Sequence, residues 1–404
     1  MRFIRFPAFA ARQSGTSAAA GASRSRVLWL ACVAHALHDG YTDLIYVLLP
    51  VWQADFGLDY AALALLRGVY VGTMASLQML AGRLARTLGN RMTLALGTLL
   101  AAAGYALAGM SGGLVGLGAA LAIAGAGSST QHPLASSAVS KSFGRDARGP
   151  LSVYNFSGDI GKAALPAAIA LLVTLMPWRH ALWVVSLAGC GVAAALALLM
   201  PSIPRGEAVE ARTHDAAGQG SGKGFALLLT TGVLDSAVRM GLLTLLPFLL
   251  KEKGASLTMV GTALSLVFIG GAAGKFACGW LGARIGVIGT TLATETGTAV
   301  CILAVLLCPL TPAMALLPLL GVMLNGTSSA LYGTVPELAR AGHTERAFAT
   351  FYTGTIGSGA LAPVVYGFLG DRIGVHGAVV ATALTALTIV PLALALRPLL
   401  PQQR

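Results

Sequence analysis

The dominant pattern along the chain is a series of long apolar stretches separated by short polar loops. A stretch of about 20 mostly apolar residues is long enough to cross a bilayer as a helix. Twelve such stretches are present, at 27–51, 61–82, 92–111, 114–139, 149–174, 179–200, 225–250, 257–281, 287–308, 312–338, 347–369 and 375–397. The pattern therefore predicts an all-α polytopic membrane protein with twelve transmembrane helices.

The amino-acid composition excludes several classes of protein. Of 404 residues, 56% are hydrophobic and only 10% are charged, whereas a soluble domain carries about 25% charged residues. A soluble globular enzyme is therefore excluded. The net charge of +12 does not indicate nucleic acid as a partner, because the Lys and Arg residues lie in short loops. The five cysteines lack metal-site spacing, and no nucleotide-binding or catalytic motif is present, so we expect no cofactor and no enzyme activity.

The distribution of positive charge predicts the orientation. Of the 27 Lys and Arg residues, 19 lie in the two termini and the even-numbered loops, and only four lie in the odd-numbered loops. Cytoplasmic loops carry the excess of Lys and Arg. We therefore expect a multi-pass protein of the cytoplasmic (inner) membrane with both termini in the cytoplasm. The segment 1–26 lacks the apolar core of a signal peptide and is expected to be a cytosolic tail.

The chain divides into two similar halves. A Gly-, Pro- and charge-rich loop at 201–223 separates a six-helix bundle at 27–200 from a second at 224–398, with a short cytosolic tail at 399–404. At an offset of 197 residues, several positions of the first half match the second, namely Pro50 with Pro247, Gly57 with Gly254, Gly82 with Gly279 and Gly89 with Gly286. Internal repeats of this kind are typical of transporters, whose binding sites lie between the repeats.

The loops after spans 2 and 8 carry a recognisable motif. The first copy contains Gly82, Arg86, Gly89 and Arg91; the second contains Gly279, Arg284 and Gly286. These loops resemble the G-x-L-A-D-R-x-G-R signature of the major facilitator superfamily, although the acidic position is occupied by Arg86 and Ala283. A further copy, GFLGDR at 367–372, follows span 11. The resemblance implies two bundles that rock about a central site, with these loops taking part in the conformational change.

Two longer stretches resemble one group within that superfamily, the fosmidomycin-resistance exporters. They are AHALHDGYTDLIYVLLPVWQADFGL in span 1 and GAGSSTQHPLASSAVSKSFGRDARGPLSVYNFSGDIGKAALP across spans 4 and 5. The group usually has Glu after His-Pro, where this chain has Leu134. The resemblance implies proton-coupled efflux of an anionic molecule by antiport, and hence antibiotic resistance.

Span 1 carries a polar stripe on one face. The stripe contains His35, His38, Asp39, Asp43 and Tyr46 at steps of three and four residues. An ionisable side chain at membrane depth costs about 2.5–3.5 kcal/mol and by default marks a transport pathway. We expect Asp39 and Asp43 to exchange the coupling proton, and His35, His38 and Tyr46 to bind the substrate. The alternatives are a ladder of structural hydrogen bonds, or a divalent-metal site formed by His35, His38 and Asp39.

Spans 5 and 7 carry candidate anion-binding groups. Asn155, Asp159 and Lys162 share a face of span 5, and Asp235 precedes Arg239 by one turn in span 7. Lys162 and Arg239 are expected to bind the substrate anion, and Asp235 to join the proton-coupling acids. The alternative for Asp159 and Lys162 is a structural ion pair between the two.

Spans 4 and 10 add weaker candidates. His132 is expected to bind the substrate or a proton, or to be structural beside Pro133; Asn325 and Tyr332 are expected to line the site. Arg67 and Lys275 are expected to extend toward the membrane surface, and Glu295 to have a structural role.

Together these features predict a proton-coupled secondary transporter of a small anionic or zwitterionic molecule. An efflux antiporter is favoured by the resemblance. The alternatives are a proton symporter for uptake of an organic acid or sugar, and a divalent-metal or metal-chelate exporter. The expected partners are the substrate, protons and the lipid bilayer, and the chain is expected to act as a monomer.

Overall fold

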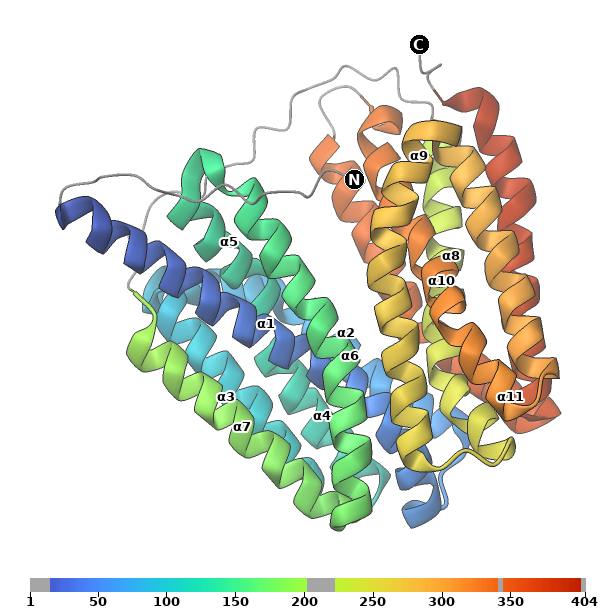
Figure 1. Cartoon of the computed structure of the whole chain (residues 1–404), viewed down its shortest axis with the longest axis horizontal. Coiled ribbons are helices and arrows are strands. Elements are labelled where there is room, and N and C mark those ends of the chain that lie inside the picture. Colours follow the sequence, from blue (N-terminus) through green and yellow to red (C-terminus); the bar gives the residue numbers. More distant parts are fainter. Residues whose placement is uncertain (1–14, 202–221, 341–343, 401–404) are drawn as a thin grey trace, which may run out of the picture.

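The computed structural model describes residues 15–201, 222–340 and 344–400, and this part of the chain consists of helices and connecting turns (Figure 1). The first half contains α1 (Gly15–Phe56), α2 (Tyr60–Leu88), α3 (Asn90–Gly109), α4 (Leu114–Ser128), α5 (Gln131–Phe143), α6 (Arg148–Leu175) and α7 (Trp178–Leu199). The second half contains α8 (Gly222–Glu252), α9 (Leu257–Leu307), α10 (Leu310–Leu338) and α11 (Thr344–Leu396). We call these two groups of helices the N-terminal and C-terminal bundles.

The polytopic helical fold is confirmed. Ten described helical segments are long and apolar enough to cross a membrane. The helix α1 is long but more polar, because it carries the stripe that begins at His35. Kinks at Gly286 and Gly374 divide α9 and α11, so each of these helices contains two of the expected spans.

The expected tails and central loop are described only in part. Residues 1–14, 202–221 and 401–404 lie outside the described residues. The N-terminal tail expected at 1–26 differs from the structure in its second part, because α1 already begins at Gly15. The Ala- and Ser-rich sequence there continues the helix of the first span.

Matching positions of the two halves adopt the same local structure. Gly57 and Gly254 have φ values of 64° and 88°, and Gly89 and Gly286 have values of 83° and 73°. Glycine is favoured at these positions because a side chain would strain the left-handed conformation. Two residues after Gly57 and Gly254, the side chains of Asp59 and Ser256 cap the N-termini of α2 and α9, respectively.

The fourth expected span, 114–139, is helical but its hydrogen bonding is interrupted. The helix α4 ends at Ser128 and α5 begins at Gln131, while Ser129 and Thr130 between them keep helical backbone angles. Pro133 lacks the N–H that would bond to the Ser129 carbonyl, and its ring disfavours a regular helix there. The break places His132 on the first turn of α5, within the bundle.

Glycines bring α1 and α6 into close contact. A Cβ atom on Gly161 would clash with the carbonyl oxygen of Ala36, and one on Gly40 would lie 2.6 Å from Leu165. The neighbours of these glycines, Asp39 and Lys162, therefore face each other across a short distance. This packing positions the central charges described below.

The two bundles meet at one end of the molecule and diverge toward the end where α1 begins and α11 terminates (Figure 1). At the closed end, a Cβ on Gly367 of α11 would lie 2.6 Å from the Tyr60 carbonyl oxygen of α2. On the other side of the interface, a Cβ on Gly261 of α9 would clash with Ala170 of α6. Ser265 of α9 also donates a hydrogen bond to the Ala163 carbonyl.

Candidate functional site

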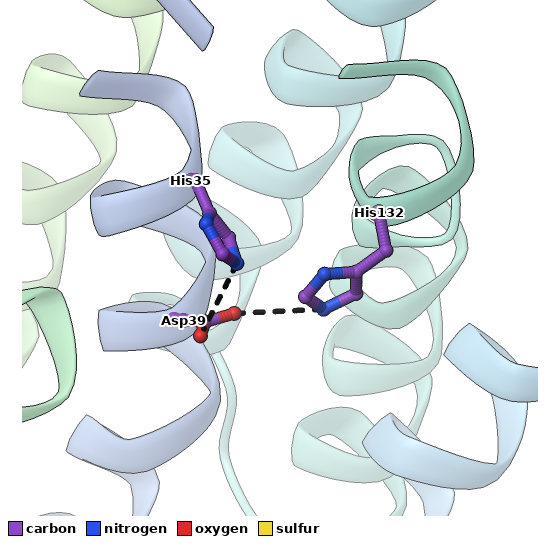
Figure 2. A group of neighbouring side chains, drawn as sticks. All are labelled: His35, Asp39 and His132. Atoms are coloured by element: carbon purple, nitrogen blue, oxygen red, sulfur yellow. Dashed lines mark ion pairs between the residues drawn. The ribbon is translucent and has the colours of Figure 1, made fainter. Parts of the chain in front are cut away.

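Asp39 lies at the centre of a buried polar cluster in the N-terminal bundle. Asp39 is only 7% exposed to solvent. The carboxylate lies 3.4 Å from His35 Nε2, 3.5 Å from His132 Nε2 and 3.3 Å from Lys162 Nζ. These partners come from α1, α5 and α6, and Figure 2 shows the two imidazoles turned toward the carboxylate. Residues expected from the sequence to act separately are therefore brought together around one acid.

The orientation of His35 is set by the helix α6. Its Nδ1 lies 2.7 Å from the carbonyl oxygen of Tyr154, which can only accept, so Nδ1 carries a proton. The imidazole also stacks on the Tyr154 ring at 4.1 Å. Gly158 leaves the space for this arrangement, because a Cβ there would lie 2.5 Å from Asp39 Oδ2 and 2.7 Å from His35 Cε1. The Nε2 atom of His35 thus points at Asp39.

The same cluster offers three metal donors, but they differ from the expected set. His35, Asp39 and His132 present donor atoms within 4.8 Å of one another. His38 points elsewhere, since its Nδ1 lies 2.9 Å from Ser128 Oγ and its Nε2 lies 3.0 Å from Thr98 Oγ1. The ammonium group of Lys162 already occupies the cationic position beside Asp39.

A second buried pair lies one turn further along α1. Asp43 Oδ1 is 4.0 Å from Arg67 Nη2, and the Arg67 guanidinium lies 4.4 Å from the centre of the Tyr46 ring. Both Arg67 and Tyr46 contact the sulfur of Met240 in the C-terminal bundle, at 3.3 and 3.5 Å. The expectation that Arg67 extends to the membrane surface is wrong: the residue is 2% exposed.

Asp159 and Lys162 do not pair chiefly with each other. Asp159 Oδ1 lies 2.6 Å from the ammonium nitrogen of Lys275 on α9, and Oδ2 lies 2.8 Å from it. Lys275, expected to extend to the surface, instead joins the two bundles. Although Asp159 and Lys162 are three residues apart on α6, helix packing brings other charges closer to each of them. Lys162 pairs with Asp39, and Asp159 pairs with Lys275.

In the C-terminal bundle, Arg239 and two acids form a third centre. Arg239 Nη2 lies 3.7 Å from Asp235 Oδ2, and Nη1 donates to Ser328 Oγ of α10 at 3.3 Å. Glu295, on the second part of α9, interacts electrostatically with Asp235 and Arg239. Glu295 is 2% exposed, so it lies inside the bundle.

The other expected residues lie outside these three centres. Asn155 is exposed on α6. Asn325 donates to the Gly321 carbonyl of its own helix at 3.2 Å. Tyr332 packs among aromatic rings of α11, with Phe348 and Tyr352 each at 5.0 Å.

Among the loop-motif residues, Gly89 and Gly286 have left-handed backbone conformations. Arg284 stacks on the Trp280 ring at 4.0 Å. Arg86 is exposed at the end of α2, Gly82 lies in the same helix, Arg91 lies on the first turn of α3, and Gly279 lies within α9.

The sequence reasoning therefore missed three charged residues that interact with charges on other helices. Arg67, Lys275 and Glu295 were set aside because they lie toward the ends of their spans or on a span expected at the periphery. A signal was present, because acids and bases both lie well inside the spans, and charges at membrane depth require partners. Which partner each finds depends on helix packing.

Solved structures of similar fold are transporters. A bacterial homolog to the human lysosomal transporter Spinster, in inward-facing and occupied conformation, has a TM-score of 0.77 with 16% identity, covering 93% of this chain and 97% of that one. A point mutant of the nucleoside transporter NupG has a TM-score of 0.76 with 14% identity, covering 92% of this chain and 99% of that one. At these identities the likeness establishes the fold.

Sequence comparisons give the family. No curated protein matches the chain. The family model described as Major Facilitator Superfamily matches it twice, over residues 31–230 and 227–404. The two matches cover the two halves in turn, as the internal repeat predicts. The fold and these matches together make the chain a secondary transporter, not an enzyme, and it belongs to the Major Facilitator Superfamily.

Proposed function

We propose that this protein is a proton-coupled transporter of a small anionic molecule in the cytoplasmic membrane, with both termini in the cytoplasm. The observation that carries the proposal is the Asp39–Lys162 contact of 3.3 Å, one turn of α1 from Asp43, on which the buried Arg67 and the partly buried Arg239 both act. A phosphonate is the first substrate to test, because of the resemblance to the fosmidomycin-resistance exporters.

The distribution of Lys and Arg supports the proposed orientation. With cytoplasmic termini, the end at which the bundles diverge faces the cytoplasm, so the conformation is inward-facing. Charges from both bundles of a single chain complete the site, which supports a monomer as the working unit.

Unpaired guanidinium donors support an anionic substrate. Within the described part of the chain, Nε and Nη1 of Arg67 and Nε of Arg239 are buried and have no hydrogen-bond partner. Leaving a buried charged donor unpaired is costly. An anion between the bundles would satisfy these donors, and the planar guanidinium suits carboxylate or phosphonate oxygens. Lys162, which is 33% exposed, would supply a third positive charge.

The ion pairs support coupling of the anion to a proton. While Asp39 is ionised, it neutralises Lys162; once Asp39 binds a proton, Lys162 is free to bind the anion. In the same way, Asp43 would neutralise Arg67 and Asp235 would neutralise Arg239 as long as these acids are ionised. By linkage, a ligand that favours the protonated state is itself favoured by protonation. An anion and a proton would therefore be carried in the same direction, which is the symport alternative.

Efflux by antiport is the second candidate, and it applies to a zwitterionic substrate. The His132 side chain is 43% exposed beside Asp39, which leaves the acid approachable. An amino group that binds Asp39 would displace the proton, so substrate and proton would move in opposite directions.

Transport into proteoliposomes tests the proposal. With an imposed pH gradient, phosphonates and other organic anions are expected to move down the proton gradient, and amino-containing substrates against it. Lys162→Gln should abolish this movement, whereas Lys251→Gln, at an exposed position in the last turn of α8, should not. Anion transport that is indifferent to the pH gradient would overturn proton coupling.

A further inference from the structure

The Arg67 guanidinium has weak partners for a charge that is 2% exposed. Its Nη2 lies 4.0 Å from the Asp43 carboxylate, beyond the range of an N–H···O hydrogen bond, and the guanidinium lies 4.4 Å from the centre of the Tyr46 ring. Among the described residues, neither Nε nor Nη1 has a hydrogen-bond partner. In that part of the chain, the acceptor that Nη2 reaches is the sulfur of Met240, at 3.3 Å.

The hydroxyl of Tyr46 is directed at the same sulfur. It donates to Met240 Sδ at 3.5 Å, and the Tyr46 side chain is fully buried. Two donors of the N-terminal bundle therefore converge on one atom of the C-terminal bundle. A thioether is a weak acceptor and carries no charge, so it does not neutralise the guanidinium.

A guanidinium and a hydroxyl that point at one position are suitable partners for an oxygen of a carboxylate or phosphonate. We propose that the Met240 sulfur occupies the position of a substrate oxygen, and that the bound anion displaces it from Arg67 and Tyr46. Met240 is then a specificity-determining residue, because only a stronger acceptor can replace its sulfur. The inference rests on the anion transport proposed above and names where one oxygen of the anion binds.

The displacement would exchange one link between the bundles for another. Without substrate, the Met240 sulfur joins α1 and α2 to α8. Methionine can withdraw readily, because its side chain is unbranched and has three rotatable bonds. Arg239 precedes Met240 on α8 and has a buried Nε without a partner among the described residues. An anion with two or more oxygens would contact Arg67 with one and Arg239 with another.

Binding of methylphosphonate and of acetate to the purified full-length protein, measured by calorimetry, tests the displacement. Met240→Leu removes the competing acceptor at similar volume, so anions should bind roughly three- to tenfold tighter, or about 0.7–1.4 kcal/mol. Met240→Gln supplies an amide oxygen, a stronger acceptor that stays on Arg67, so binding should weaken by a similar factor. Met314→Leu is the matched control, at a partly buried methionine of α10 that packs against the hydrophobic core, and should bind as the wild type does.

The opposite directions separate this role from simple packing. Affinities that change in the same direction in both Met240 variants, or in neither, would overturn the role of Met240 and leave the proposed function standing. If neither anion binds to the wild type or to Met240→Leu, both proposals fail. Opposite changes in affinity, together with transport that ignores the pH gradient, would keep the anion subsite and reject proton coupling.

A second variant keeps the question open to measurement if melting curves show that the Met240 variants do not fold. Tyr46→Phe removes the hydroxyl donor and keeps the ring below Arg67. It should weaken anion binding roughly three- to tenfold, because the oxygen loses one of its two partners. Unchanged binding by Tyr46→Phe would overturn the proposed subsite.

Discussion

The carboxylate of Asp371, in the C-terminal bundle, accepts a hydrogen bond of 2.8 Å from the backbone nitrogen of Tyr60, at the start of α2 in the N-terminal bundle. Its second oxygen accepts from the nitrogen of Ala61 at 3.0 Å. The first turn of a helix has unpaired N–H groups and favours a negative charge. Asp371 thus caps a helix of the opposite bundle, at the end where the two bundles meet.

Loss of this cap should favour opening at that end. Asp371→Ala is expected to shift the ratio of the two conformations roughly 2- to 30-fold, because helix caps contribute about 0.5–2 kcal/mol. Distances between spin labels on α2 and α11 would measure the shift. Asp146→Ala, at an exposed acid before α6, serves as the control. Equal distances in both variants would show that the cap does not stabilise this state.

Asp39→Asn should separate substrate binding from proton coupling. The amide cannot neutralise Lys162, so the ammonium becomes available to the anion at every pH. We expect anion binding to tighten on the order of tenfold, or about 1.4 kcal/mol, and to lose much of its dependence on pH. Calorimetry with a transported anion at two pH values measures both effects. Weaker binding with an unchanged pH dependence would contradict this role of Asp39.

Gly158→Ala, on α6, should disturb the polar cluster around Asp39 of α1. The added Cβ would lie 2.5 Å from Asp39 Oδ2, so the carboxylate has to move away from His35. Overpacking of this kind costs about 1–3 kcal/mol, and we expect a lower melting temperature together with loss of transport. Gly191→Ala is the matched control, because nothing lies within 4 Å of a Cβ there. Full transport by Gly158→Ala would show that the contact is dispensable.

His38 and His35 should behave differently although they lie on the same stripe. His38→Ala leaves the buried hydroxyl of Thr98 without its imidazole partner, and unsatisfied buried groups cost about 1–3 kcal/mol. We expect reduced thermal stability and an unchanged pH profile of transport. His35→Ala should instead shift the pH profile, because its Nε2 faces Asp39. A shifted pH profile of transport in His38→Ala would contradict this expectation, because it would mean that His38 also takes part in proton coupling.

Zinc binding should depend on Lys162. In the wild type the ammonium lies beside Asp39, so we expect zinc to leave the melting temperature nearly unchanged. Lys162→Met frees three donors, and zinc at about 100 times its dissociation constant should then stabilise by about 2.7 kcal/mol. Adding His132→Ala should remove the effect. Strong stabilisation of the wild type by zinc would instead favour the metal-export alternative.

The spans, the two halves and the family could be predicted from the amino-acid sequence. A bilayer requires long apolar helices whatever their neighbours, so the twelve stretches could be read locally. Glycines such as Gly89 and Gly286 mark the same bend in both halves because the left-handed conformation is a property of the residue itself. The polar stripe on α1 was visible for the same reason, since helical spacing alone places its members on one face.

Which charges pair with each other depends on how the helices pack. Lys162 lies one turn from Asp159 in sequence, yet close packing at Gly40 and Gly161 brings it to Asp39. Asp159 is then paired by Lys275, from the other half of the chain. An ion pair depends on distances of a few ångströms between helices, and residue spacing along one helix carries no information about those distances.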